Sequence, residues 1–182
     1  MIKHFIGIDP GKNGAIVWLE PAKDNNVTTY TFPRIGKELD YKGLSHLISL
    51  HCSEDSHVVL EKVHAIFGSA AGATFSFGHI CGFIEGVLVA NKQAFTMVQP
   101  KEWQKEIWQG IPEIRKPATK IEKGKRKGQM RKGSIDTKAM SLMAAQRLFP
   151  SVSLLATERC TTPHDGIADA LLMAEYCRRR FK

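Results

Sequence analysis

FIGIDPGKNGAIVW, residues 5–18, decides the fold, because one apolar run ends there on an acid and a second begins after a short turn. The first run favours a β-strand, which Pro10 and Gly11 terminate. Residues 15–19 predict a second strand, so the two form a hairpin with Asp9 at its mouth. A carboxylate at the end of a buried strand is costly to desolvate unless it pairs with a cation. Either Asp9 has such a partner elsewhere in the chain, or it caps the turn.

Length and charge narrow the class of protein. With 182 residues the chain suits one good core but not two ordinary domains, so we expect a single domain over residues 1–182. The 26 Lys and Arg against 18 Asp and Glu give a formal charge of +8, which favours a polyanionic partner, with nucleic acid first. The cysteines are widely spaced, as in cytosolic proteins with reduced thiols. The sequence has no long unbroken apolar run and no signal-peptide pattern, so we expect a cytoplasmic protein without membrane contact.

The hydrophobic patterns along the rest of the chain predict a mixed sheet. Further strands are expected over 26–32, antiparallel to the second, and over 57–63 and 95–100. Helices are expected over 39–52, 72–92 and 101–109, from a cap at Ser134 or Asp136 to about 149, and after an N-cap at Thr162. The order β-β-β-α-β-α-β-α predicts an α/β fold, a five-stranded mixed sheet with helices on both faces.

A basic segment interrupts this pattern. Residues 112–138 hold ten Lys or Arg, three acids and almost no large apolar side chain. Such a composition cannot bury a core, so we expect an exposed loop or a disordered insert at about 112–134.

Three more acids stand where a charge is unfavourable. Glu61 ends the strand expected over 57–63, as Asp9 ends the first strand. Asp165 and Asp169 are four residues apart on one face of the last helix, where two like charges repel each other. Asp165 has a structural alternative, because Thr162-x-x-Asp165 resembles a capping box. Asp169 lies within the apolar run of the helix, so a purely structural role explains it less well.

A metal site would explain all four acids together. A mixed sheet can place the ends of the two strands side by side, and the last helix can pack across them. With two divalent ions about 3.5 to 4 Å apart, four carboxylates form a site that activates water and stabilises the leaving oxygen in phosphodiester cleavage. Ligands that are all oxygen favour Mg²⁺, two ions per site, with Mn²⁺ as a substitute.

The GIDPG strand, the LEKV strand and the HDGIADALLMAEY helix, in this order and at these separations, resemble the RuvC family of Holliday junction resolvases, especially its phage-type members. The resemblance spans residues 5 to 178. It implies a ribonuclease H-like fold, a homodimer, and paired Mg²⁺-dependent nicks across a four-way DNA junction. It also implies that Asp9, Glu61 and Asp169 are catalytic metal ligands, with Asp165 as the fourth acid.

The chain departs from the family pattern at two places. In bacterial members the fourth acid lies three residues before the last one, where this chain has Gly166, so His164 is a rival to Asp165. Those members also carry an aromatic residue three positions after the strand glutamate, where this chain has His64. Stacking on an unpaired base would then fall to Phe67, Phe75 or Phe77, each of which also suits a core or an interface.

Two further sets of residues point to partners. A charge run is usually a solvated face, but one that separates the elements carrying the acids also suits DNA phosphates. The expected DNA-binding residues are Lys123, Lys125, Arg126, Lys127, Arg131 and Lys132 and, by loose alignment with basic positions of the family, Lys105 and Lys138. Gly78, Gly82 and Gly86 cost helix stability and predict a close backbone neighbour, either in the same protomer or across a two-fold axis. The equivalent family helix lies at the dimer interface.

Other classes share parts of this pattern. Actin-like and sugar-kinase-like ATPases begin with a similar strand and turn, but they need a second lobe for which the chain is too short. A ribonuclease H-like nuclease acting on an RNA/DNA hybrid or on other branched DNA would use the same metal chemistry. A non-catalytic DNA-binding subunit is a third alternative, against which the acids argue. Neither a junction resolvase nor a ribonuclease H-like nuclease needs a small-molecule cofactor, so we expect none.

Overall fold

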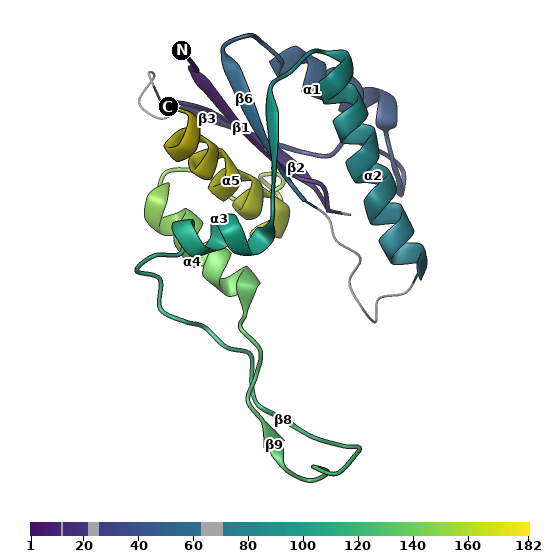
Figure 1. Ribbon diagram of the computed structural model, residues 1–182, viewed down its shortest axis with the longest axis vertical. Coiled ribbons are helices and arrows are strands. Elements are labelled where there is room, and N and C mark those ends of the chain that lie inside the picture. The colour runs from purple at the N-terminus through teal and green to yellow at the C-terminus, as the bar shows by residue number, and fades with distance from the viewer. Residues whose placement is uncertain (12, 22–25, 63–70) are drawn as a thin grey trace.

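A five-stranded mixed sheet forms the centre of the protein (Figure 1). The computed structural model describes residues 1–11, 13–21, 26–62 and 71–182. The strands lie in the order β3-β2-β1-β6-β7. Neighbours pair antiparallel from β3 to β1 and parallel from β1 to β7. Their bounds are β1 His4–Asp9, β2 Ala15–Glu20, β3 Asn26–Thr31, β6 Ser56–Glu61 and β7 Phe95–Val98.

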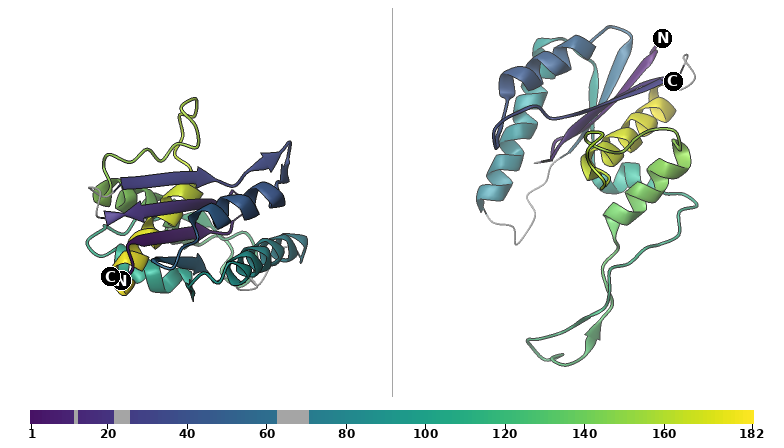
Figure 2. Two further views of the ribbon diagram at one scale, coloured as in Figure 1. Left: turned by 90° about the horizontal axis from the view of Figure 1, so that it is seen from above. Right: turned by 180° about the vertical axis from the view of Figure 1, so that it is seen from behind.

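Helices cover both faces of this sheet (Figures 1 and 2). One layer holds α1 (Tyr41–His51) and α2 (Ala71–Ala90). The other holds α3 (Pro100–Ile107), α4 (Thr137–Leu148) and α5 (Asp165–Phe181). Side chains alternate along β1, so that Ile6 and Ile8 pack with the first layer and Phe5 with the second. The expected α/β fold is confirmed, in an arrangement consistent with a ribonuclease H-like fold.

Gly7 lets α5 approach β1 more closely than any other residue would. A Cβ atom at Gly7 would lie 2.0 Å from the carbonyl oxygen of Ala170 and 2.5 Å from the amide nitrogen of Ala174. The small residues of α5 therefore rest directly on the backbone of the central strand. Because Asp169 precedes Ala170 in α5, this packing determines where Asp169 lies relative to the end of β1.

Two helix starts were predicted from capping residues, with different outcomes. Asp136 caps α4 as expected, because its Oδ1 accepts a hydrogen bond from the amide of Ala139 at 3.2 Å. The prediction that Thr162 caps the last helix is wrong. The cap of α5 is His164, whose Nδ1 accepts from the amide of Ile167 at 3.3 Å, and Asp165 is the first helical residue. The capping-box explanation of Asp165 therefore does not hold.

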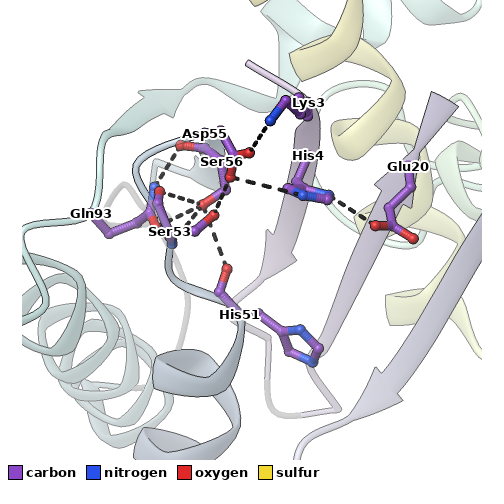
Figure 3. A network of polar contacts seen from close by, with 8 residues as sticks. All are labelled: Lys3, His4, Glu20, His51, Ser53, Asp55, Ser56 and Gln93. Atoms are coloured by element: carbon purple, nitrogen blue, oxygen red, sulfur yellow. Dashed lines mark hydrogen bonds and ion pairs between the residues drawn. The ribbon is translucent and has the colours of Figure 1, made fainter. Parts of the chain in front are cut away.

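A network of hydrogen bonds and ion pairs lies at the end of the sheet where β1 and β6 begin (Figure 3). The Gln93 side chain accepts from the Ser56 hydroxyl at 2.8 Å and from the Ser53 amide at 2.9 Å, and it donates to the Ser56 carbonyl at 2.7 Å. Nearby, His4 lies 3.2 Å from Glu20 across the β1–β2 pair. The hydrogen bonds of Gln93 satisfy polar groups that would otherwise be buried without partners, and all these contacts lie at the opposite end of β1 from Asp9.

The basic insert is an ordered hairpin that projects from the body of the protein (Figure 1). It contains the two-residue strands β8 (Thr119–Lys120) and β9 (Met130–Arg131), and an isolated bridge joins Arg115 to Ile135 at its base. The expectation of an exposed segment is confirmed, although its backbone is paired rather than a loop. A second small hairpin, β4 (Arg34–Ile35) and β5 (Glu38–Leu39), was not anticipated.

One apolar face of helix α2 is not covered by any of the described residues. A Cβ atom added at Gly78, Gly82 or Gly86 would meet no described atom within 4 Å, so the prediction of a close neighbour within the protomer is wrong for the described residues. Phe75 and Val89 are also exposed, at 75% and 64%. By length and composition α2 could cross a membrane, a test that helices of soluble proteins also pass, and 17% of its apolar stretch is buried. The absence of membrane contact stays a prediction.

Candidate functional site

The carboxyl ends of two neighbouring parallel strands carry the first two acids. In the β1–β6 pairing Ile8 lies opposite Leu60, which puts Asp9 and Glu61 side by side at the next position. The first turns of α5 bring Asp165 and Asp169 to the same place, and both interact electrostatically with Asp9. Four acids separated by up to 160 residues thus form one cluster, which we call the acid cluster.

Burial and mutual repulsion disfavour the charged forms of three of these acids. The pKa of Asp9 is raised to about 8 by desolvation, then by the charges of Asp169 and Glu61. Desolvation raises the pKa of Glu61 to about 7, with Asp169 adding to the rise. The pKa of Asp169 rises to about 6 through burial and the charge of Asp165. A bound cation would favour the charged forms and reverse these shifts.

Asp9 and Glu61 each accept a hydrogen bond, whereas one oxygen of Asp169 has no described donor. Asp9 Oδ1 accepts from the amide of Gly11 at 3.0 Å, so Asp9 does close the turn that follows β1. Glu61 Oε1 accepts from the indole nitrogen of Trp103 at 3.2 Å. Asp169 Oδ1 is buried, and no described residue donates a hydrogen bond to it. An unpartnered buried carboxylate oxygen is unfavourable, and a cation would satisfy it.

Asp165 differs from the other three acids because it lies at the rim of the cluster. Its side chain is 40% exposed, and its Oδ2 contacts the ammonium group of Lys138. Lys138 stands on the first turn of α4, immediately after the basic hairpin, and Asp165 and Asp169 both raise its pKa. The structure therefore places Lys138 at the acid cluster.

His164 is occupied as a helix cap. Because Nδ1 accepts the Ile167 amide, the proton of the neutral ring resides on Nε2, which then cannot coordinate a metal. Burial also lowers the pKa of His164, which favours this neutral form. Among the two rivals for the fourth position, the arrangement favours Asp165.

Gly166 lies closely against the β1–β2 turn and the first acid of the cluster. A Cβ atom there would lie 2.3 Å from the carbonyl oxygen of Asn13 and 3.0 Å from Oδ2 of Asp9. Any side chain at 166 would therefore force the β1–β2 turn or Asp9 to move. In this chain the start of α5 is packed too tightly against the first acid for an aspartate at that position.

The acid cluster has the chemistry of a Mg²⁺ site but not a finished coordination shell. Its donors are carboxylate oxygens, and it contains a buried oxygen without a hydrogen-bond partner. Within the described ranges, no three His, Cys, Asp or Glu side chains are already arranged to hold a metal ion. The residues fit the ion by type, charge and proximity, and their carboxylates would turn toward it on binding.

The excess positive charge of the whole chain lies on one hairpin. Nine of the 26 Lys and Arg but only one of the 18 Asp and Glu fall within residues 115–132, which leaves 17 of each sign elsewhere. The formal charge of +8 therefore belongs to this segment alone. All the DNA-binding residues expected within it are exposed: Lys123, Lys125, Arg126, Lys127, Arg131 and Lys132. Lys105 is exposed on α3, and the described contacts do not join it to the acid cluster.

A hollow of about 610 Å³ opens between the β4–β5 hairpin and the amino-terminal half of α2. Gly11, which hydrogen-bonds Asp9, lies in its lining beside Lys37 and Tyr41. Phe75 and Phe77, two of the expected stacking residues, line it as well. His64 and Phe67 lie outside the described residues.

Sequence reasoning missed Trp103 and Ser141. Trp103 is fully buried in α3, and Ser141, buried in α4, lowers the pKa of Asp169. Neither residue belongs to the motifs that indicated the acids, and each comes from an element remote from its partner in sequence. A polar residue in an apolar helix pattern, as at Ser141, was the only signal available.

Comparison with known proteins gives no further information about this site. No protein-family model matches the chain, and no curated protein matches it significantly. The function is therefore argued from the residues of the acid cluster and the basic hairpin.

Proposed function

We propose that this protein is a Mg²⁺-dependent, structure-selective endonuclease that resolves four-way DNA junctions by paired nicks. The observation that carries the proposal is the acid cluster, in which three acids with raised pKa values and one unpartnered buried oxygen meet at the carboxyl ends of β1 and β6. A protein gains little stability from such a cluster, and an active site commonly contains one.

The carboxylates have distinct roles in this proposal. Asp9, Glu61 and Asp169 would hold two Mg²⁺ ions, or Mn²⁺ in their place, and Asp165 would complete the shell from the rim. The ions would supply an activated water and stabilise the leaving oxygen of the phosphodiester. Lys138, which already contacts Asp165, is placed to contact a phosphate that reaches the acids.

The basic hairpin supports DNA as the substrate. It concentrates the whole charge excess of the protein on an exposed arm that projects from the layer of α3, α4 and α5 (Figure 1). Lysines and arginines on such an arm would contact phosphates and release condensed counterions, which adds affinity without reading base sequence. Its base connects through Asp136 and α4 to Lys138 at the acid cluster.

A homodimer would place two acid clusters on one junction. Paired nicks need two active sites, and a two-fold axis provides them. The face of α2 formed by Phe75, Gly78, Gly82, Gly86 and Val89 is apolar, and the described residues leave room for a second backbone against its glycines. We propose this face as the dimer contact of a cytoplasmic enzyme in a bacterial or phage-infected cell.

Cleavage assays test the proposal. The wild-type protein and the Asp9→Asn variant should be incubated with Mg²⁺ and a four-way junction, a nicked duplex or an RNA/DNA hybrid. We expect symmetric nicks in the junction by the wild type, and none by Asp9→Asn, which should still bind the junction. Preferential cutting of the hybrid would favour a ribonuclease H-like enzyme instead. Binding without cleavage by both proteins would indicate a non-catalytic DNA-binding subunit.

A further inference from the structure

The side chain of Glu61 is held by an indole from another element. Trp103, in α3, has no exposed surface, and its Nε1–H donates to Glu61 Oε1 at 3.2 Å. Glu61 is the last residue of β6, 42 positions earlier in the chain. The contact therefore exists only because α3 packs beneath the end of the sheet.

This hydrogen bond gives the carboxylate a defined orientation. A glutamate side chain has three rotatable bonds, whereas the indole is fixed by the close-packed core around it. With Oε1 taken by the indole, Oε2 remains for a cation. The same hydrogen bond favours the charged form of Glu61, against the effect of burial.

A second indole, that of Trp108, lies beside Trp103 and makes no described contact with the acid cluster. Trp108 contacts Trp103 edge to face, with ring centroids 6.1 Å apart. Its Nε1 is buried, and no described residue accepts a hydrogen bond from it. Trp103 is fully buried and Trp108 is partly buried, and in the described contacts only Trp103 hydrogen-bonds to an acid of the cluster.

We propose that Trp103 is a positioning residue, which orients the Glu61 carboxylate for binding of a divalent cation. This inference rests on the proposed metal site and identifies a residue that acts through a ligand rather than as one. Hydrogen-bond donors that orient metal-binding carboxylates change metal affinity by about 10- to 100-fold when removed.

The first test compares Trp103→Phe with Trp108→Phe in the full-length protein. Both substitutions remove an indole N–H and keep an aromatic ring. Because Trp103 is fully buried and Trp108 only partly buried, the unfolding free energy of each variant is measured in parallel, so that a loss of packing can be told from a loss of metal affinity. Mn²⁺ binding is measured directly, by calorimetry and by the electron paramagnetic resonance of free Mn²⁺. We expect the affinity for Mn²⁺ to fall by about 10-fold or more in Trp103→Phe. In Trp108→Phe it should stay within about twofold of the wild-type affinity. Equal affinity in all three proteins would overturn the proposal.

The second test keeps Trp103 in place, so it does not depend on the folding of a variant. In the ¹⁵N-labelled protein, the indole N–H signals of the three tryptophans are assigned with Trp18→Phe and Trp108→Phe. We expect the Trp103 signal to move when Mg²⁺ is added, and also when Glu61→Gln replaces the charged acceptor without metal. The Trp18 signal should stay in place. A Trp103 signal indifferent to both changes would contradict a role in orienting Glu61.

The outcomes separate this inference from the proposed function. If neither the wild type nor Trp108→Phe binds Mn²⁺, the metal site itself is wrong, and the positioning role falls with it. If the wild type binds Mn²⁺, Asp9→Asn does not, and Trp103→Phe equals the wild type, the metal site stands and only the role of Trp103 is refuted.

Discussion

The acid cluster should make the metal-free protein less stable as the pH rises. A carboxyl group with a higher pKa in the folded than in the unfolded chain holds its proton more tightly when folded. Its contribution is therefore most favourable below the unfolded pKa, near 4, and is lost as the pH rises through the folded pKa. For Asp9 this window runs from the ordinary value of 3.8 to about 8.

The size of the effect follows from the Asp9 shift. Between the two pKa values of Asp9, the free energy of unfolding falls by about 1.36 kcal/mol for each pH unit. The interval from pH 4 to pH 7 covers about three of the roughly four pH units between them, so the loss of stability is about 4 kcal/mol. Water entering at the half-exposed Asp165 side of the cluster reduces this value. We therefore expect Asp9→Asn to raise the free energy of unfolding at pH 7 by about 2 to 4 kcal/mol, and the melting temperature by roughly 5 to 15 °C.

Urea unfolding in EDTA, followed by circular dichroism, tests this reasoning. The wild type and Asp9→Asn are compared at pH 4, 5.5, 7 and 8, so that other titrating groups cancel in the difference. Near pH 4 the two proteins should differ by less than about 1 kcal/mol. At pH 8, Mg²⁺ at about 100 times its dissociation constant should stabilise the wild type by about 2.7 kcal/mol and the variant much less. A stability difference that does not change with pH, or a variant less stable at pH 8, would refute the argument.

Three other predictions concern the packing of α5, the basic hairpin and the surface of α2. Gly7→Ala should cost more than about 3 kcal/mol of unfolding free energy, because its Cβ would collide with the backbone of α5; Gly72→Ala, whose Cβ would meet no described atom within 4 Å, is the urea-unfolding control. Replacing Lys123, Lys125, Arg126 and Lys127 by Ala should weaken junction and duplex binding alike. The slope of log affinity against log salt should become shallower by roughly three to four. The control variant, Lys42→Ala with Lys92→Ala, should leave this slope unchanged. An unaltered slope in the hairpin variant would mean that the hairpin is a solvated arm without phosphate contacts. Gly82→Leu meets no described atom within 4 Å of its Cβ and should leave the fold intact, but it should convert the proposed dimer to a monomer in light scattering; a monomeric wild type at micromolar concentration would contradict the dimer.

Local sequence determined most of the secondary structure. The apolar runs of β1 and β2, the turn at Pro10 and Gly11, and the Asp136 cap each act within a few residues, so they could be predicted without knowledge of the tertiary structure. The ends of β1 and β6 also followed from sequence, because an acid directly after an apolar run marks the edge of the buried sheet.

Longer-range packing decided what the local patterns left open. Thr162 suits a helix cap by residue type, but the helix begins two residues later, with His164 as its cap. The basic segment has too few apolar residues to predict strands, yet backbone pairing across its ends makes it a hairpin. The glycines of α2 predicted a close neighbour, whereas the described part of the protomer leaves them uncovered.

The sequence by itself determined which side chains belong to the site: it placed Asp9 and Glu61 at strand ends and Asp165 and Asp169 on one helix face. Only the tertiary structure decided their surroundings, namely the raised pKa values, the unpartnered Asp169 oxygen and the hydrogen bond from Trp103 to Glu61. The physical reason is that residue type and spacing are local properties of the chain. Desolvation, repulsion between charges and the direction of a hydrogen bond instead depend on which distant elements pack together.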